Sequence, residues 1–207
     1  TVTAGDSYSR GNYAYLKGTA TDGTNTVSAW RDYTVEMDVQ RAVVDGKSDS
    51  VYLLGRVQED GSCYAFEFNG EINLYKINAG NGIYNGGKTV NGTRVLNKGS
   101  AGANYAGWIH LYMTFSGSTI TVGYSYEKED GSIGSASYSH TDSSYQSGGI
   151  GLSVINNDDK SGLTVNMDNL KVTLADGTVA YYDVFDSAAT PEPVDVTYTW
   201  TEQLNSY

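Results

Sequence analysis

Alternation of apolar and polar residues, broken by tight-turn signals, is the feature of this sequence that most restricts its fold. Residues 33–40, Tyr-Thr-Val-Glu-Met-Asp-Val-Gln, place apolar side chains on one face and polar side chains on the other. Two further runs, residues 51–57 and 63–68, are separated by Asp60-Gly61, a pair that favours a two-residue type I′ hairpin turn. With a second turn at residues 69–71, the stretch predicts four successive antiparallel strands.

The register of this hairpin decides which side chains share a face of the sheet. A two-residue turn joins Val51, Leu53 and Val57 to the aromatic residues of the next strand. The opposite face then carries a mainly polar group: Tyr52, Leu54, Arg56, Gln58, Cys63, Ala65, Glu67, Asn73 and Tyr75. We therefore expect an exposed sheet surface on which an arginine, a carboxylate, an amide and two tyrosines converge.

The composition supports one β-rich domain. The 207 residues include 25 Gly and 18 Tyr but only 2 Pro, and β-branched and aromatic runs separated by Gly, Asn and Asp indicate many short strands. No sustained apolar repeat of 3.6 residues is present, so we expect almost no helix. Further strands are expected at residues 108–115, 119–126, 148–155 and 163–174, with long loops around one or two short strands at residues 78–106. This pattern predicts an all-β antiparallel sandwich or barrel.

The net charge of the chain limits the classes of molecule that it is expected to bind. A net charge of −11, from 13 Lys plus Arg against 24 Asp plus Glu, argues against nucleic acid and anionic membranes, because both require a basic surface. Neutral glycans suit such a surface better. The lone Cys63 has no internal disulfide partner and is expected to be a buried or half-buried bystander. No signal peptide or transmembrane run is expected in these residues.

Four groups of residues, taken in their order and spacing, carry a family resemblance. They are Trp30-Arg-Asp-Tyr-Thr-Val-Glu-Met-Asp-Val39; Leu54-Gly-Arg-Val57 with Tyr64-Ala-Phe66 and Leu74-Tyr-Lys76; Trp108-Ile-His-Leu111; and Gly149-Ile-Gly-Leu152 followed by Met167-Asp-Asn-Leu-Lys-Val172. Over residues 28–174 the chain resembles a concanavalin A-like (laminin-G-like) jelly roll, in particular the carbohydrate-binding modules attached to bacterial polysaccharide-degrading enzymes. The resemblance implies an all-β antiparallel β-sandwich (jelly roll, concanavalin A-like).

The same resemblance implies a function. The chain is expected to be a non-catalytic carbohydrate-binding module that recognises a plant or microbial polysaccharide on its concave sheet. It would be extracellular, secreted or at the bacterial cell surface, and part of a multimodular chain, with no nucleic acid and no membrane as partner. One alternative is a structural repeat domain of a bacterial surface adhesin. Another is a polysaccharide lyase or glycosidase of the same fold.

The resemblance also assigns residues to the ligand site. In such families the arginine after the second strand's glycine often contacts sugar on the concave sheet, a role that falls on Arg56. Its forked guanidinium suits hydroxyls or a carboxylate. The other expected ligand-binding residues supply hydrogen bonds or ring contacts: Glu67, Asn73, Gln58, Tyr52 and Tyr75.

A structural calcium ion near the chain termini is a further implication of the resemblance. The aspartate of the closing Asp-Asn pair often helps to bind it, and here that residue is Asp168. Calcium takes several oxygen ligands, and Asp6, Asp22 and Asp183 are the candidates to complete the shell. The alternative is that Asp168 is a solvated turn residue.

The C-terminal residues differ in composition from the rest. Both prolines lie within residues 187–194, which resemble a linker, so we place the jelly-roll domain at residues 1–186 and a linker with a strand-like tail at residues 187–207. Residues 181–186 and then 200–204 resemble the first strand of such domains and the tryptophan after it, and residues 1–6 resemble the segment that comes next in those domains. The tail is expected either to complete the same sandwich, as in a circular permutant, or to start a following repeat. An unstructured tail is the alternative.

The catalytic motifs of this fold are incomplete in the sequence. Retaining glucanases need two carboxylates about 5 Å apart. Glu36-Met-Asp38 begins their Glu-x-Asp-x-Glu signature, but Gln40 stands where the acid is needed. Alginate-lyase-type enzymes use an arginine, a Gln-x-His and a tyrosine-bearing strand, whereas here Trp108 stands two residues before His110. We therefore expect no enzymatic activity.

Overall fold

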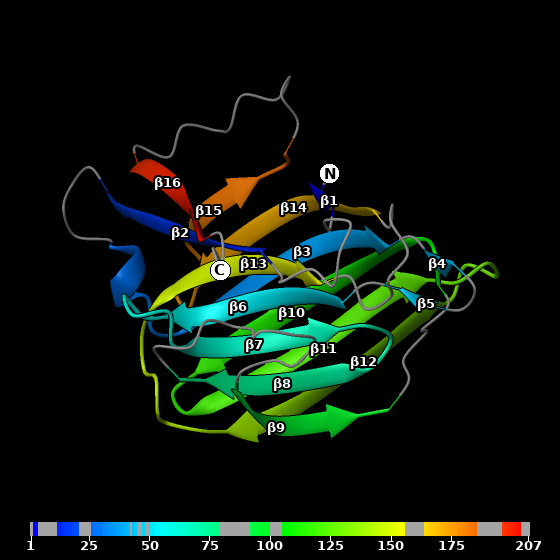
Figure 1. Ribbon diagram of the computed structural model, residues 1–207, viewed down its shortest axis with the longest axis horizontal. Helices are drawn as coiled ribbons and strands as arrows, with labels where there is room; N and C mark the ends of the chain where they lie inside the picture. Colours follow the sequence, from blue (N-terminus) through cyan, green and yellow to red (C-terminus); the bar gives the residue numbers. More distant parts are fainter. Residues whose placement is uncertain are drawn as a thin grey trace.

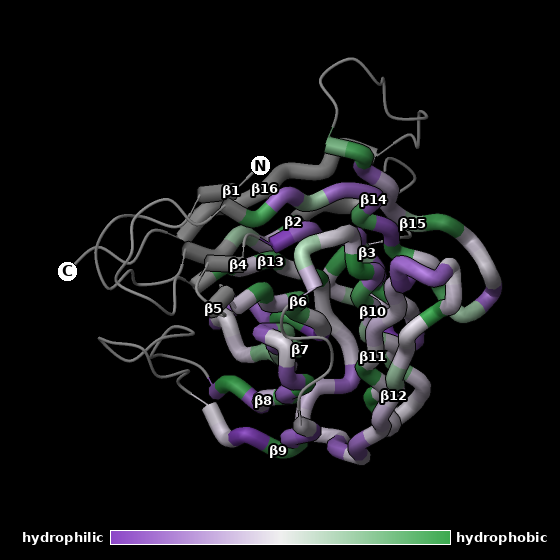
Figure 2. The backbone as a smooth tube through the Cα atoms, turned by 90° about the vertical axis from the view of Figure 1, so that its right-hand side faces the viewer, coloured by the Kyte–Doolittle hydropathy of each residue, from purple (hydrophilic) through white to green (hydrophobic). Residues whose placement is uncertain are grey.

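The computed structural model describes residues 2–3, 12–20, 26–41, 43–44, 47–48, 50–78, 92–99, 105–155, 164–185 and 196–203. Over these residues it contains two seven-stranded antiparallel sheets, one two-stranded sheet and one short 3-10 helix. The two large sheets form the layers of a sandwich (Figure 1) and are seen edge on, side by side, in Figure 2. The expected all-β class is confirmed.

The first large sheet, sheet A, has the strand order β1-β14-β3-β10-β11-β12, with β15 paired to β14. Its strands are β1 (Val2–Thr3), β3 (Tyr33–Arg41), β10 (Trp108–Ser116), β11 (Thr119–Glu127), β12 (Ile133–Thr141), β14 (Thr164–Leu174) and β15 (Val179–Asp183). The second, sheet B, has the order β16-β2-β13-β6-β7-β8-β9. Its strands are β2 (Asn12–Ala20), β6 (Ser50–Val57), β7 (Cys63–Phe68), β8 (Ile72–Ile77), β9 (Gly92–Lys98), β13 (Gly149–Ile155) and β16 (Val196–Gln203).

The chain passes repeatedly from one sheet to the other. From β2 in sheet B it enters β3 in sheet A, then forms β6 to β9 in sheet B and β10 to β12 in sheet A, and returns through β13 and β14. The small elements η1 (Val27–Ala29), β4 (Val43–Val44) and β5 (Lys47–Ser48) lie in the connections before and after β3. Two antiparallel sheets linked by such crossings form a jelly-roll sandwich, and the expected fold class is confirmed.

The core between the sheets follows from the alternation of residues. In β3 the side chains of Tyr33, Val35, Met37 and Val39 are buried, and the residues between them are partly exposed. Ile109, Leu111, Met113 and Phe115 of β10 are buried in the same way. Burial of one such apolar side chain contributes about 1.5–3 kcal/mol, so these rows account for much of the packing energy of the sandwich.

The β6–β7 hairpin keeps the expected faces up to Gly55, but its pairing is displaced by two residues, since the predicted turn would place Leu54 opposite Glu67. Tyr52 pairs with Glu67 and Leu54 with Ala65. The predicted two-residue turn is wrong, because Gln58 N–H donates to Ser62 O at 2.8 Å and three residues lie between them. Gly61, the last of the three, has φ = 88°, a left-handed conformation that closes such bulged three-residue loops.

The register fails at Arg56. This residue has φ = 47°, and its N–H turns to donate to the Tyr33 hydroxyl at 2.7 Å. A residue that leaves the extended conformation reverses the direction of the side chains after it. Val57 therefore joins the outer face of sheet B, with Leu54 and Cys63, rather than the core predicted for it.

The C-terminal strand β16 pairs antiparallel with β2 along eight residues of each strand, from Val196 opposite Ala20 to Gln203 opposite Tyr13. At the other end of the chain, β1 pairs with β14 in sheet A. Residues 187–195 lie outside the described residues. The division of the chain at residue 186 stays a prediction, as does the circular relation between its two ends.

Deletion of residues 187–207 is expected to lower the melting temperature by several degrees. The deletion exposes the N–H and C=O groups through which β2 pairs with β16, and unpaired strand edges are destabilising and prone to association. The change is measured by thermal unfolding followed by circular dichroism. Deletion of residues 204–207 alone, beyond the end of β16, is the control. An unchanged melting temperature in the longer deletion would show that β16 adds nothing to this domain.

Candidate functional site

Three of the predicted ligand-binding residues, Tyr52, Asn73 and Tyr75, donate hydrogen bonds to the carboxylate of a fourth, Glu67, on the outer face of sheet B. Ser50 is a further donor. Ser50 and Tyr52 each donate a hydrogen bond to Oε1 at 2.7 Å. Asn73 Nδ2 and the Tyr75 hydroxyl each donate to Oε2 at 3.1 Å. Adjacent strands place these groups, since Glu67 pairs with Tyr52 on one side and with Asn73 on the other.

The Glu67 carboxylate is already satisfied. Asn69 Nδ2 lies 3.4 Å from Oε1 as a fifth donor, and a carboxylate has about four lone-pair directions. Glu67 therefore has little capacity left to accept hydrogen bonds from a sugar. Its chemical role is to orient Tyr75, which is half-buried, and Asn73, which is buried and accepts a hydrogen bond from Asn97.

The predicted exposure of this face is wrong at its centre. Tyr52 and Asn73 are 1% exposed and Glu67 is 6% exposed. The physical reason is a second hydrophobic cluster on the same face, which packs against Tyr75 and consists of Tyr15, Tyr52, Leu54, Val57, Cys63, Ala65 and Ile77. The expected burial of Cys63 is confirmed.

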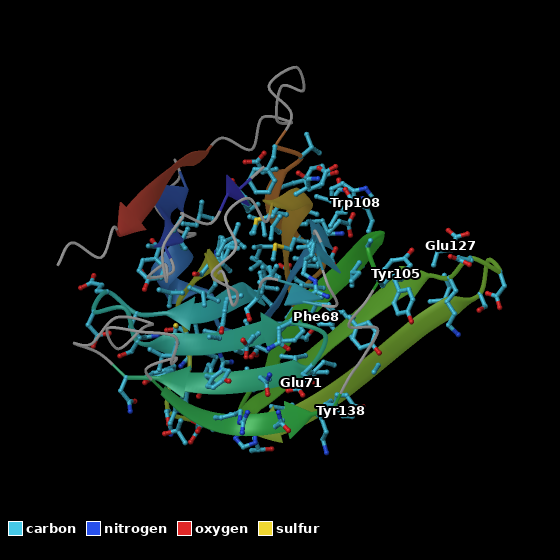
Figure 3. All side chains as sticks on the ribbon, turned by 45° about the vertical axis from the view of Figure 1, so that its right-hand side comes forward. Phe68, Glu71, Tyr105, Trp108, Glu127 and Tyr138 are labelled. Carbon is cyan, nitrogen blue, oxygen red and sulfur yellow. The ribbon has the colours of Figure 1, made fainter. Side chains whose placement is uncertain are left out.

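The accessible part of this face lies toward β9. Arg94 on β9 pairs with Tyr75 on β8 and is exposed. Asn97, also exposed, donates to Asn73 Oδ1 and lies 3.4 Å from Glu71 Oε2. Figure 3 labels Glu71, at the start of β8. Arg94, Tyr75 and Asn97 form what we call the β8–β9 rim.

The electrostatics of the β8–β9 rim centre on Tyr75. Burial and the neighbouring Glu67 carboxylate raise the pKa of Tyr75 to about 12, while Arg94 acts in the opposite direction through its charge and a hydrogen bond. The tyrosine is therefore neutral at physiological pH and keeps its hydroxyl proton. Arg94 adds a planar cation beside the half-buried ring.

Arg56 does not share this face, and the prediction that it does is wrong. Its side chain is 1% exposed, and the guanidinium lies 4.7 Å from the centre of the Phe115 ring, which belongs to the core. Its Nε and Nη2 donate to Arg31 O, at 3.2 and 2.9 Å. Nη1 donates to Tyr145 O at 2.8 Å, and Nη2 also donates to Gly117 O at 2.7 Å. Arg56 thus ties three connecting segments together at one end of the sandwich.

A cavity of about 300 Å³ adjoins this end of the sandwich. Its lining residues come from several turns: Arg31, Asp32, Arg56, Gly117, Ser118, Ser143 and Gln146. Gln58 lies near it and donates to Arg56 O at 2.7 Å and to Ser147 O at 2.6 Å. Neither Arg56 nor Gln58 joins the Glu67 cluster. Ligand contact by either residue stays a prediction, and for Arg56 the route would be this cavity.

The predicted calcium ligands do not form a site among the described residues. No group of three or more His, Cys, Asp or Glu side chains there is arranged to hold a metal ion. Asp183 accepts from the Tyr181 hydroxyl at 3.0 Å and from Phe185 N–H at 2.7 Å. Asp168 accepts from Asn169 N–H at 2.8 Å. Asp6 and Asp22 lie outside the described residues, so calcium binding stays a prediction.

The residues considered for catalysis are distributed over both sheets. His110 lies on β10 of sheet A, where its Nδ1 is 2.8 Å from Asp38 Oδ1, whereas Tyr75 lies on β8 of sheet B. Arg56 lies at the end of the sandwich. Glu36 forms an ion pair with Lys171 on the outer face of sheet A. Of these residues, Arg56, His110 and Tyr75 therefore lie apart from one another.

The chain is similar, at low sequence identity, to several proteins of known structure. Carbohydrate binding module CBM66 from Bacillus subtilis is similar over 71% of this chain and 78% of its own, with 16% identity and a TM-score of 0.47. The CBM2 module of the Lactobacillus casei BL23 phage J-1 evolved Dit matches 74% of this chain and 65% of its own, with 11% identity and a TM-score of 0.47. A family 7 alginate lyase, A1-II′, matches 77% of this chain and 68% of its own, with 12% identity and a TM-score of 0.43. No protein-family model and no curated protein matches the sequence.

In the part of the chain that the structure describes, no helix combines the length and apolar character that a membrane crossing needs.

Sequence reasoning missed Arg94 and Asn97. Both lie on β9, within the segment predicted to contain one or two short strands. Alternation along residues 92–98 would place Arg94 and Asn97 on opposite faces of the strand, so it gives no signal that the two residues lie together. The register shift between Leu74 and Tyr75 decides which β9 residue faces Tyr75, and that shift has no signature in the sequence.

Proposed function

We propose that this chain is a non-catalytic carbohydrate-binding module, and that its ligand contacts the β8–β9 rim on the outer face of sheet B. The observation that supports the proposal is the exposed Arg94 guanidinium beside the half-buried Tyr75 ring, above a carboxylate that holds Tyr75 and Asn73 in place. The resemblance found in the sequence supports the same function.

Each rim residue has a chemical role in this proposal. The Arg94 fork donates two hydrogen bonds to sugar hydroxyls or to a carboxylate, the Tyr75 ring contacts an apolar sugar face, and the Asn97 amide adds a donor and an acceptor. A small, open site buries little of its ligand, so we expect a dissociation constant of roughly micromolar to millimolar. We place the protein outside the cell, as one module of a longer chain.

Substitution of Arg94 by alanine is expected to weaken glycan binding by roughly tenfold or more, because a charge-assisted hydrogen bond contributes about 1.5–3 kcal/mol. The melting temperature should stay within about a degree of wild type, since the side chain is exposed. Retardation in affinity gels that contain a panel of polysaccharides measures the binding, with and without a calcium chelator.

Arg31→Ala is the matched control for this experiment, because Arg31 is an exposed arginine at the cavity near Arg56. Retardation that is lost in Arg31→Ala and kept in Arg94→Ala would move the site to that cavity and contradict the proposal. Shortened polysaccharide in the gel would contradict the non-catalytic role. A loss of retardation with chelator in wild type would support the predicted calcium ion.

A further inference from the structure

The outer face of sheet A carries a row of rings along β10. Trp108, His110 and Tyr112 alternate with the buried Ile109 and Leu111, so they point away from the core. Trp108 is 44% exposed, the His110 side chain is 38% exposed and Tyr112 is partly exposed. Successive rings are about 7 Å apart along the strand, which is the rise of two residues. Figure 3 labels Trp108, at the start of the strand.

The Tyr112 ring lies against the sheet. Its neighbour on β11 is Gly123, and a Cβ added at Gly123 would lie 2.4 Å from the Tyr112 hydroxyl oxygen and 2.5 Å from Cζ. The ring therefore occupies the space that a side chain on β11 would need. The His110 and Tyr112 rings are 6.4 Å apart and inclined by 32°. Together they give a shallow, nearly flat surface.

Polar groups on β3, β14 and β15 border one side of this row. Asp38 accepts from Asn169 Nδ2 at 2.8 Å on one oxygen and faces His110 with the other. Asn169 in turn accepts from the Tyr182 hydroxyl at 3.0 Å. The ion pair between Lys171 and Glu36 lies in the same region, and Glu36 is also 3.8 Å from His110 Nε2. Each of these carboxylates thus has a basic or amide partner.

Hydroxyl groups border the other side. Thr121 on β11 and Ser139 on β12 are paired residues whose side-chain oxygens are 2.9 Å apart. Ser135 and Ser137 lie along the same face of β12, in a strand whose side chains alternate between exposed and half-buried. The row of rings therefore lies between acidic and amide groups on one side and small hydroxyls on the other.

We propose that this face is a second carbohydrate-binding surface, which takes a linear neutral polysaccharide along β10. Flat rings contact the apolar faces of sugar units, and the bordering carboxylates, amides and hydroxyls match sugar hydroxyls. A neutral chain fits because the charged groups of the face are paired with one another, which leaves little to attract a polyanion. This surface is on the opposite sheet from the β8–β9 rim, so it is independent of the site proposed above.

The test uses the full chain and soluble neutral polysaccharides, namely mixed-linkage β-glucan, xylan and galactomannan, in affinity gels. In the Arg94→Ala background, Trp108→Ala and Tyr112→Ala are each expected to weaken the remaining binding, and together by roughly tenfold or more. Ile133→Ala is the control, since Ile133 is 64% exposed but lies on β12, away from the row. If Tyr112→Ala lowers the melting temperature, Trp108→Ala alone decides the result.

The outcomes separate the two sites. Binding that Arg94→Ala removes completely would overturn the second surface and leave the β8–β9 rim intact. Binding that Arg94→Ala weakens and the added β10 variants weaken further would support both sites. Binding that Arg94→Ala leaves unchanged and the β10 variants remove would support the second surface and contradict the rim. A concentration-dependent dimer that Trp108→Ala dissociates, without any effect on glycan binding, would assign the row to contact between copies and overturn the proposal.

Discussion

Replacement of Arg56 by alanine is expected to lower the free energy of unfolding by about 3–5 kcal/mol, because several charge-assisted hydrogen bonds and a cation–π contact are lost together. The substitution removes the cation from the Phe115 ring and leaves the carbonyl oxygens of Arg31, Tyr145 and Gly117 without their donor. A hydrogen bond from a charged group contributes about 1.5–3 kcal/mol, and water that reaches these partly buried oxygens offsets part of the loss.

Urea denaturation of wild type, Arg56→Ala and Arg56→Lys measures this effect. Lysine keeps the positive charge but lacks the planar guanidinium group, so it is expected to recover only a minor part of the lost free energy of unfolding. Arg31→Ala, at an exposed arginine, should change the free energy of unfolding by less than about 0.5 kcal/mol. A loss below about 1 kcal/mol in Arg56→Ala would show that the three segments hold together without the guanidinium.

The Arg56→Ala variant is not suited to locating the ligand site. Because Arg56→Ala is expected to unfold part of the population, loss of glycan retardation in that variant would not locate the ligand site. Arg94→Ala is the informative variant, since its side chain is exposed and ties no segments of the core together.

Replacement of Glu67 by alanine is the second large effect, with an expected loss of about 3–5 kcal/mol in the free energy of unfolding, because several buried donors lose a charged acceptor together. Ser50, Tyr52 and Asn73 are buried, and each would lose the acceptor of its hydrogen bond. Buried donors without acceptors carry the full cost of desolvation. The carboxylate itself is 6% exposed, so water cannot readily take its place.

Glu67→Gln is the matched variant for this position. It keeps the shape and one acceptor oxygen but turns the other oxygen into a donor that faces Asn73 and Tyr75 or Ser50 and Tyr52. A tyrosine hydroxyl can rotate to accept, so we expect a smaller loss of about 1–2 kcal/mol. Chemical denaturation compares the three proteins. Equal stability of Glu67→Ala and wild type would mean that the donors find other partners and that Glu67 does not organise the rim.

Local patterns were sufficient for much of the fold. The period-two alternation in β3 and β10 identified the buried rows, because the direction of a side chain in a strand depends only on its position along that strand. The shared face of Tyr52, Glu67, Asn73 and Tyr75 was also accessible from the sequence, because alternation alone gives it. The pairing of Tyr52 with Glu67 was not, since the predicted two-residue turn places Leu54 opposite Glu67.

Three features depended on contacts between distant residues. Arg56 leaves the predicted face because its N–H bonds to Tyr33, 23 residues earlier in the chain, and a single positive φ reverses the side chains of the residues after it. Arg94 reaches Tyr75 through a register shift that only the paired strands reveal. The flat Tyr112 ring requires a glycine at its neighbour on β11, Gly123.

The sequence by itself thus determined β3, β6, β7, β8, β10, β11, β13 and β14, the buried rows of β3 and β10, and the shared face of Tyr52, Glu67, Asn73 and Tyr75, because these depend on alternation and on short turns. Only the tertiary structure decided that the cluster is buried, that Arg56 is a structural residue, and that Arg94 is the accessible arginine of that face. The reason is that burial and the partner of a long side chain are set by the segments packed around it. Those segments are brought together by the two-sheet topology, which no local pattern encodes.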